Sequence, residues 1–181
     1  LSAIKFYIST IGSLTNDKKL NEILTKANNA LLDVNSNVRS ICFNLMPQTL
    51  EAFGLLKAVT ELCNQMTVPG HLSFVITGDK QVLPDNKSQE IAIFRIIQEF
   101  INNALKHGKA SRILINFKKH KASLKIILED NGIGFKLFDK KETGMGLRNV
   151  QSRIASYNGE IKITSSPGKG TKYELMIPLS T

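Results

Sequence analysis

The stretch KSQEIAIFRIIQEFINNALKH, from Lys87 to His107, decides how the rest of the chain is interpreted. It predicts a helix that is apolar on most sides, because residues three and four positions apart lie on one helical face. One face carries Ile91, Phe94, Ile97, Ile101 and Leu105, and Ile93, Ile96, Phe100 and Ala104 extend it. A polar line interrupts this surface and consists of Arg95, Glu99, Asn102, Asn103 and Lys106. A buried carboxylate and amide must be satisfied, either by other protein groups or by a bound cation and ligand.

Length and composition limit the classes of protein to which the chain can belong. Its 181 residues suffice for one full domain and an appendage, but not for two large domains. Apolar residues make up 42% of the chain and charged residues 22%, which is ordinary for a globular protein. No apolar run reaches the length of a membrane span, and no signal peptide is visible. The chain begins with Leu1 and not with methionine, so we expect it to be part of a longer protein.

The cysteines and the charge add two further expectations. Cys42 and Cys63 stand among apolar helical neighbours, so they predict small core residues in a reduced setting, without a disulfide or metal site. Lys and Arg number 24 against 15 acidic residues, which gives a net charge of +9. The excess is scattered and not interleaved with aromatic residues, so nucleic acid is not the expected partner. A phosphate-bearing ligand or an acidic protein fits the charge equally well.

The N-terminal segment predicts two helices that form a hairpin. Apolar residues of the second helix recur alternately four and three positions apart, which is a heptad pattern. The seam of the second helix comprises Leu20, Leu24, Ala27, Leu31, Val34, Val38, Ile41 and Leu45, and the seam of the first comprises Leu1, Ile4, Ile8 and Ile11. Thr15, Asn16 and Asp17 supply the turn and the helix cap between them. So narrow a stripe favours a four-helix bundle made by two copies of the chain, and the alternative is a hairpin packed on its own domain.

The remaining pattern predicts an α+β domain. Pro47 is expected to end the second helix, because the residue before a proline avoids helical angles. The elements expected after it are a helix at 51–66, a strand at 71–77, the helix at 87–107, a hairpin of strands 113–117 and 124–128, a loop at 129–144, a helix at 145–157 and a hairpin of strands 160–165 and 172–179. Helices followed by antiparallel hairpins indicate a two-layer α/β sandwich, with one sheet covered by helices. The expected parts are therefore a helical hairpin at 1–46, a connecting segment at 47–70 whose helix packs on the next part, and the α/β domain at 71–181.

Three glycine-bearing segments follow the helix of residues 87–107. Residues 130–135 (DNGIGF) end a buried strand, where glycine allows a ligand to approach the backbone and a carboxylate can accept a hydrogen bond from an exocyclic amine. Residues 144–147 (GMGL) stand where a helix begins, a position suited to phosphate. Residues 168–171 (GKGT) are by themselves a turn. Each segment alone is a common loop sequence, whereas their order after a helix with glutamate and asparagine four apart is distinctive.

In this order the segments resemble the ATP-binding domain shared by sensor histidine kinases, gyrase-type topoisomerases, Hsp90 chaperones and MutL proteins. IIQEFINNALKHGKAS, which contains residues 99–107, resembles the N box, DNGIGF the first glycine box, GMGL the second, and GKGT the last motif. The QEFINNALKH form of the N box, the stretch LMPQTLEAFGL and the short loop between the glycine boxes are most similar to sensor histidine kinases of the nitrate-sensor type. The chain departs from that group at Met46, where an arginine is frequent. The resemblance implies a Bergerat-type ATP-binding fold, preceded by a helical hairpin that dimerises.

The resemblance also implies a role for each matching residue in a site for ATP and Mg²⁺. Asn103 is expected to ligate Mg²⁺, a hard cation that prefers oxygen ligands. Glu99 stands at the position of the water-activating base of the hydrolytic relatives, and in a kinase we expect it to orient metal-bound water. Asp130 is expected to bind the adenine amino group, and Thr171 to help hold Asp130. The other expected contacts are Lys106 and His107 with phosphates or ribose, and Gly132, Gly134, Gly144, Gly146 and Leu147 around a lid over ATP.

Some of these residues have an alternative interpretation. His107 could equally be a structural histidine whose hydrogen bonds are satisfied within the protein. Arg95 and Arg148 are expected to form structural ion pairs and not to contact the ligand.

The histidines bear on the reaction that the resemblance implies. A sensor histidine kinase phosphorylates a histidine that is followed by an acidic residue able to take its proton. The family pattern places that pair just before the segment that resembles LSAIKFY, and residues 1–46 contain no histidine. His71, His107 and His120 fall on a strand, in the nucleotide site and in a basic turn, so none is expected to be the acceptor. We therefore expect a kinase core that phosphorylates a histidine upstream of Leu1, for relay to the receiver domain of a response regulator.

Three other functions are compatible with parts of the pattern. An anti-sigma-type serine kinase is disfavoured by the heptad hairpin, which such kinases generally lack. A gyrase- or Hsp90-like ATPase is favoured by Glu99 alone, and a non-catalytic dimerisation module is opposed by the intact motifs. For the leading interpretation we expect a homodimer through residues 1–46 and a cytoplasmic location, with any membrane anchor outside the sequence given.

Overall fold

The computed structural model describes residues 2–15, 17–78, 84, 86–136 and 145–179. For residues 2–6, 9, 29, 31–47 and 145 it describes the backbone alone. The chain forms two compact units, Leu1–Leu45 and Met46–Thr181.

The first unit contains helix α1 (Ser2–Leu14) and the beginning of helix α2 (Lys18–Met66). The predicted cap is present, because the Asp17 carboxylate accepts a hydrogen bond of 2.8 Å from the backbone N–H of Lys19. In the described part of the seam Ile11 and Leu20 are exposed, while Leu24 and Ala27 are half-buried. From Leu31 onward, the side chains of the seam lie outside the description. Pairing of these helices as a dimerising hairpin therefore stays a prediction.

Helix α2 does not end where the sequence predicted. It continues through Pro47 and departs from helical geometry at Gly54, whose φ is 76° and ψ is 176°. The prediction that Pro47 ends the helix was wrong, because the avoidance of helix before a proline is a bias that helices can override. The positive φ at Gly54 is open to glycine and strained for other residues. The part after the break packs into the core through Leu55, Ala58, Val59, Leu62 and Cys63.

The cysteine prediction can be tested at one of its two positions. Cys63 is free and buried, and burial raises the pKa of its thiol to about 12, so the thiol is inert at neutral pH. Cys42 falls among the residues whose side chains lie outside the description.

The second unit is built on a five-stranded sheet with the order β1-β2-β3-β5-β4. Its elements are β1 (Ser73–Gly78), α3 (Lys87–Lys106), β2 (Arg112–His120), β3 (Ser123–Asp130), α4 (Met145–Ala155), β4 (Glu160–Ser165) and β5 (Thr171–Pro178). The antiparallel pairs β2–β3 and β4–β5 were predicted, whereas the parallel pairing of β1 with β2 was not. Because parallel neighbours need a crossover, α3 is the connection between them. Strand β3 extends through Asp130, so the predicted loop starting at Glu129 begins later.

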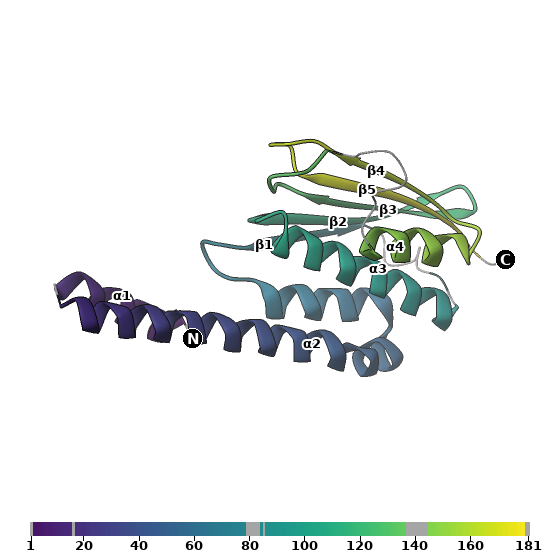
Figure 1. Ribbon diagram of the computed structural model, residues 1–181. Helices are drawn as coiled ribbons and strands as arrows, with labels where there is room; N and C mark the ends of the chain where they lie inside the picture. Colours follow the sequence, from purple (N-terminus) through teal and green to yellow (C-terminus); the bar gives the residue numbers. More distant parts are fainter. Residues whose placement is uncertain (1, 16, 79–83, 85, 137–144, 180–181) are drawn as a thin grey trace. The chain divides into compact units, whose positions relative to one another are not determined.

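Helices α3 and α4 cover one face of the sheet, and the part of α2 after Gly54 packs against α3 (Figure 1). The predicted two-layer sandwich is thus confirmed. The largest buried side chains include Phe94, Phe100, Phe117 and Tyr173, which come from both layers. The expected apolar face of α3 is buried at Phe94, Ile97 and Ile101, whereas Leu105 is half-buried and Ile91 is 41% exposed.

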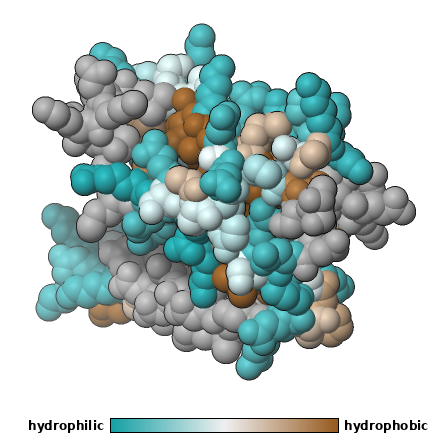
Figure 2. Space-filling view, turned by 90° about the vertical axis from the view of Figure 1, so that its right-hand side faces the viewer, coloured by the Kyte–Doolittle hydropathy of each residue, from teal (hydrophilic) through white to brown (hydrophobic). Residues whose placement is uncertain are grey.

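Hydrophilic side chains dominate the face shown in Figure 2, and apolar residues appear there only in small separate patches. Most of the apolar surface is instead enclosed between the two layers. Within the described part of the chain, no helix combines the length and the hydrophobicity needed to cross a bilayer.

Candidate functional site

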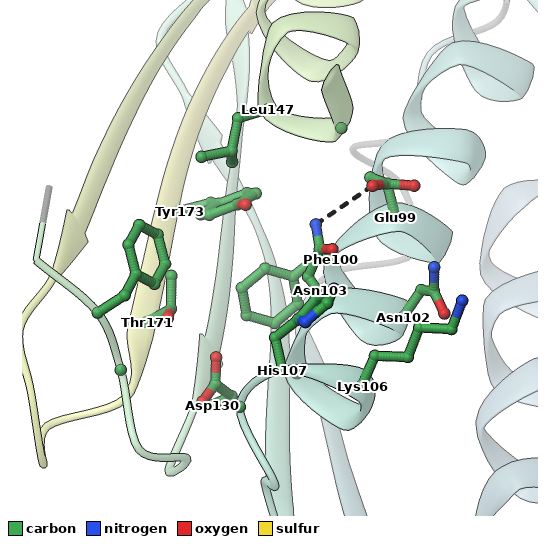
Figure 3. Close-up of a pocket in the computed structure, with 15 residues that line it drawn as sticks. Glu99, Phe100, Asn102, Asn103, Lys106, His107, Asp130, Leu147, Thr171 and Tyr173 are labelled. Carbon is green, nitrogen blue, oxygen red and sulfur yellow. Dashed lines mark hydrogen bonds between the residues drawn. The ribbon is translucent and has the colours of Figure 1, made fainter. Parts of the chain in front are cut away.

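A pocket with a volume of about 470 Å³ opens between α3, α4 and the ends of β3 and β5. Figure 3 shows Asp130, Thr171 and Tyr173 across this space from the α3 side chains of Phe100 and Asn103. The lining residues are Glu99, Phe100, Asn102, Asn103, Ala104, Lys106, His107 and Gly108 from α3 and its end, Asp130, Gly134 and Phe135 from β3 and the following loop, Gly146 and Leu147 from α4, and Thr171 and Tyr173 from β5. Most of the residues predicted from the sequence therefore meet in one cavity.

The polar line of α3 forms one wall of the pocket. Glu99 and Asn103 are half-buried, and the Asn103 amide nitrogen donates a hydrogen bond of 3.3 Å to Glu99 Oε1. A carboxylate only accepts hydrogen bonds, so this contact fixes which end of the amide faces Glu99. Gly146 lies directly against the Glu99 carboxylate, and any side chain at that position would displace it. The protein therefore satisfies some of the hydrogen-bonding groups of Glu99 and Asn103. Their remaining groups face the pocket.

Asp130 forms the opposite end of the pocket. Its side chain is 5% exposed, and Oδ1 accepts a hydrogen bond of 2.7 Å from the backbone N–H of Gly132. Burial raises the pKa of the Asp130 carboxyl, while hydrogen bonds from Gly132 and from the backbone and side chain of Thr171 act in the opposite direction. Thr171 is in turn within 3.1 Å of the Ser165 hydroxyl. Thr171 is the register partner of Asp130 across the β3–β5 pair, so the two residues are neighbours, and the role expected for Thr171 stays a prediction.

Tyr173 closes the pocket from β5 and was not predicted to be part of it. It is 1% exposed, and its ring packs edge-on against Phe100 with centroids 4.8 Å apart. Burial raises the Tyr173 pKa, the neighbouring Asn103 side chain acts in the opposite direction, and the Glu99 and Asp130 carboxylates raise the pKa further. The sequence did carry a signal for this residue, because positions 171 and 173 point to the same face of a strand.

The open side of the pocket is suited to anionic groups. Lys106 and His107 lie at the C-terminal end of α3 and are exposed. Across from them Gly146 and Leu147 belong to the first turn of α4, where backbone N–H groups have no partner within the helix. Gly144, which was expected in the same region, lies outside the described residues.

Two sets of predictions need correction. Gly132 does not line the pocket: it is buried against the carbonyl of Gly108, and its contribution is the hydrogen bond to Asp130.

Arg95 donates a hydrogen bond of 2.9 Å to Gln98 Oε1, and no ion pair of Arg95 occurs among the described residues. A neutral amide on the next turn of the same helix thus takes the place expected for a carboxylate. Arg148 is exposed on α4.

The arrangement is suited to a ligand with an amine at one end and several negative charges at the other. Asp130 can accept from an amine, the apolar walls can hold a flat ring, and the start of α4 can bind phosphate. An amide oxygen and a carboxylate are ligands that a hard divalent cation prefers. Within the described residues, no three His, Cys, Asp or Glu side chains gather as a metal cluster, so a cation here would share its ligands with the bound molecule.

The family model described as histidine kinase-, DNA gyrase B- and HSP90-like ATPase matches residues 88–181. The chain belongs to this family. The matched residues contain α3, β3, α4 and β5, which are the elements that line the pocket. The superfamily predicted from the motifs is therefore confirmed.

Named members of this ATPase family agree with the more specific resemblance. Sensor histidine kinase ComP of Bacillus subtilis is 34% identical over 166 residues, which cover 90% of this chain and 21% of ComP. Sensor histidine kinase LiaS of Bacillus subtilis is 32% identical over 149 residues, which cover 81% of this chain and 40% of LiaS. The chain thus spans less than half the length of either relative. The resemblance to sensor histidine kinases is confirmed, while the nitrate-sensor type stays a prediction.

A solved structure shows that the fold is shared as well. The histidine kinase domain of the Erythrobacter litoralis blue-light activated histidine kinase aligns with a TM-score of 0.64, over 99% of this chain and 96% of that domain. The identity is only 18%, so this comparison concerns the fold alone.

Proposed function

We propose that the chain is the catalytic core of a two-component sensor histidine kinase. It binds ATP with Mg²⁺ in the pocket, transfers the γ-phosphoryl group to a histidine, and a response regulator receiver domain then takes the group. The observation that supports this most strongly is the pair Glu99 and Asn103, which faces a cavity whose far end carries the buried Asp130.

The polar pocket residues that the sequence motifs named each have a place in this proposal. Asp130 accepts a hydrogen bond from the adenine amino group, held by Gly132 and Thr171. Asn103 ligates Mg²⁺ through its amide oxygen, and Glu99 orients water bound to the metal. When bound, Mg²⁺ neutralises charge on the phosphates. Lys106 and His107 contact the phosphates or ribose, while Gly134, Gly146 and Leu147 border the same space.

The acceptor histidine is proposed to lie on a segment outside residues 1–181. His71 lies in the turn before β1, His120 ends β2, and His107 borders the pocket itself. None is on α1 or on the part of α2 in the first unit, and the family pattern places the acceptor just before the segment that resembles LSAIKFY. Dimerisation through residues 1–46 and a cytoplasmic location belong to the same proposal.

One observation favours a second function, hydrolysis of ATP. Glu99 lines the pocket with a half-buried carboxylate, which is the placement that a water-activating base requires. Release of phosphate by this chain alone, at a rate that falls in Glu99→Gln, would support an ATPase. Under the kinase proposal release of phosphate stays at background.

Phosphorylation of a longer chain tests the kinase proposal. A chain extended upstream to include the preceding helix is incubated with Mg²⁺ and ATP labelled at the γ-phosphate, beside the 181-residue chain. We expect an acid-labile, alkali-stable phosphohistidine on the extended chain only, and its loss in the extended Asn103→Ala variant. Phosphohistidine on the 181-residue chain, or none on either chain, would contradict the proposal.

A further inference from the structure

The hydroxyl of Ser165 joins two segments that are distant in the sequence, although Ser165 itself does not line the pocket. Ser165 is the last residue of β4, and its Oγ accepts a hydrogen bond of 3.0 Å from the backbone N–H of Phe135. The same hydroxyl donates a hydrogen bond of 2.9 Å to the carbonyl of Gly170 and lies 3.1 Å from the Thr171 hydroxyl. Because a serine hydroxyl has one hydrogen and two lone pairs, it can make all three contacts at once.

Ser165 belongs to a row of residues that crosses three strands and reaches the pocket. It stands opposite Thr171 on β5, and Thr171 stands opposite Asp130 on β3. Thr171 and Asp130 line the pocket, and Figure 3 shows them across it from Glu99. Paired residues on neighbouring strands point to the same face of a sheet, so Ser165 lies next to Thr171, on the side away from Asp130. The start of β5 therefore fixes the position of the Ser165 hydroxyl.

Two hydrogen bonds hold residues 133–135 against the turn between β4 and β5. The backbone N–H of Gly168 donates to the carbonyl of Ile133 at 2.6 Å, and the backbone N–H of Phe135 donates to Ser165 Oγ. The first bond joins two backbone groups, whereas the second depends on a side chain. The Ser165 hydroxyl is therefore the part of this connection that a substitution can remove.

The Phe135 ring is the part of residues 133–135 that a bound molecule would meet. It lines the pocket and is 39% exposed, so apolar surface of the ring is open to a ligand. A flat ring that covers this surface would gain from burial and from aromatic packing. Loss of the Ser165 hydroxyl would leave the Phe135 N–H without this acceptor, and the ring would no longer be held in one place.

We propose that Ser165 is a positioning residue: its hydroxyl ties the Phe135 backbone to the start of β5 and so holds the Phe135 ring on the pocket wall, against the base of the nucleotide. This rests on the proposed function, because it concerns the base end of the same nucleotide site. Ser165 does not touch the nucleotide in this role and acts through Phe135. Its row contains Asp130 and not Glu99 or Asn103. The Ser165 hydroxyl therefore strengthens nucleotide binding to the same degree with and without Mg²⁺.

The test compares Ser165→Val with Ser165→Thr. Both side chains are β-branched and suit a strand, and only threonine keeps the hydroxyl. Affinity for a non-hydrolysable ATP analogue is measured by calorimetry with and without Mg²⁺. For Ser165→Val we expect affinity to fall about threefold to tenfold in both conditions, as for the loss of one hydrogen bond, whereas Ser165→Thr should stay within about twofold of the parent. Ser156→Ala removes an exposed hydroxyl that donates to the Arg153 carbonyl at 2.9 Å, and it should leave affinity unchanged.

A double substitution separates positioning from a general effect on the fold. If Ser165 acts through the Phe135 ring, then Ser165→Val causes no further loss of affinity in the Phe135→Ala background. Unchanged affinity in Ser165→Val would overturn the inference, as would an equal loss in Ser165→Thr, a loss seen only with Mg²⁺, or a full further loss in the Phe135→Ala background. Failure of the parent chain to bind the analogue at all would instead contradict the proposed function itself, so the two failures are distinguishable.

Discussion

Helix α3 carries two glutamates that are shielded from solvent, Glu90 in its first turn and Glu99 past its middle, and the two are satisfied in different ways. Glu90, in the first turn, is 7% exposed and accepts a hydrogen bond of 3.0 Å from the backbone N–H of Leu55. It also pairs with Lys87 at 3.2 Å, and Lys87 donates to the carbonyl of Leu50. Glu99, about two and a half turns later and so on the opposite side of α3, accepts from Asn103 and faces the pocket.

The difference separates a structural carboxylate from a functional one. At the start of α3, Lys87 donates to the Leu50 carbonyl before Gly54, and Glu90 accepts from the first N–H after it, so they satisfy backbone groups on both sides of the break in α2. Every partner of Glu90 there is part of the protein. Glu99 has fewer partners within the protein, and a cavity lies beside it. Substitutions of Glu90 and Gly54 should therefore change stability, and substitutions at the pocket should change nucleotide binding.

Asp130→Asn is expected to have the largest effect, on the pocket side. The amide keeps an oxygen for the Gly132 N–H but replaces the other oxygen with a donor, which would face the donor of the adenine amine. Affinity for an ATP analogue should fall about tenfold to a hundredfold, as for a hydrogen bond to a charged group. Affinity for GTP, whose ring carries an acceptor at the corresponding position, should fall less. Equal losses for the two nucleotides would show that Asp130 does not contact the base.

The same variant should be more stable than the parent at neutral pH. Burial raises the Asp130 pKa above the ordinary aspartate value of 3.8, so the folded state holds the proton more tightly than the unfolded state. Stability from this group is therefore fully present below the unfolded pKa and is lost as pH rises through the folded pKa. The advantage of Asp130→Asn in urea unfolding should shrink as the pH falls toward 3.8. An advantage that does not change with pH would contradict this assignment.

Glu90→Ala should lower the free energy of unfolding by about 2 to 3 kcal/mol, because it removes a charged hydrogen bond and leaves the buried backbone N–H of Leu55 without its acceptor. Urea unfolding at pH 7 measures the change. Glu51→Ala is the matched control, since Glu51 is exposed on α2. Affinity of the folded variant for the ATP analogue should stay within about twofold of the parent, below the loss of a single hydrogen bond. A large loss of affinity would contradict the distinction between a structural Glu90 and a functional Glu99.

Gly54→Ala should cost about 1 to 3 kcal/mol, because a φ of 76° with a ψ of 176° lies in a region essentially restricted to glycine. An added Cβ would also lie 3.3 Å from Glu90 Oε1. Gly70→Ala is the matched control, because Gly70 has a φ of 75° and open space around it. A greater loss at Gly54 than at Gly70 in urea unfolding would show that the added methyl disturbs the Glu90 contact. Equal losses would mean that Glu90 adjusts without cost.

Sequence patterns predicted the pocket better than the connections around it. The positions of Glu99 and Asn103 follow from helical periodicity, and Asp130 follows from its place at the end of a buried strand. Helical periodicity does not distinguish Glu90 from Glu99, because what differs is the partner that each meets in space. The break at Gly54 was not predicted since Pro47 is the stronger local signal, although glycine alone suits the observed φ. The direction of β1 was also not predictable, because it depends on where α3 returns the chain to the sheet.

The measurement that tests the central claim most directly is the Mg²⁺ dependence of ATP-analogue binding in the parent chain and in Asn103→Ala. Asn28→Ala, at a half-buried asparagine within α2 of the first unit, controls for the change of residue type. We expect Mg²⁺ to strengthen binding in the parent and in Asn28→Ala, and to have no effect in Asn103→Ala, whose thermal midpoint should stay close to that of the parent. Binding that is equally strengthened by Mg²⁺ in all three chains would contradict the assignment of Asn103 as the metal ligand.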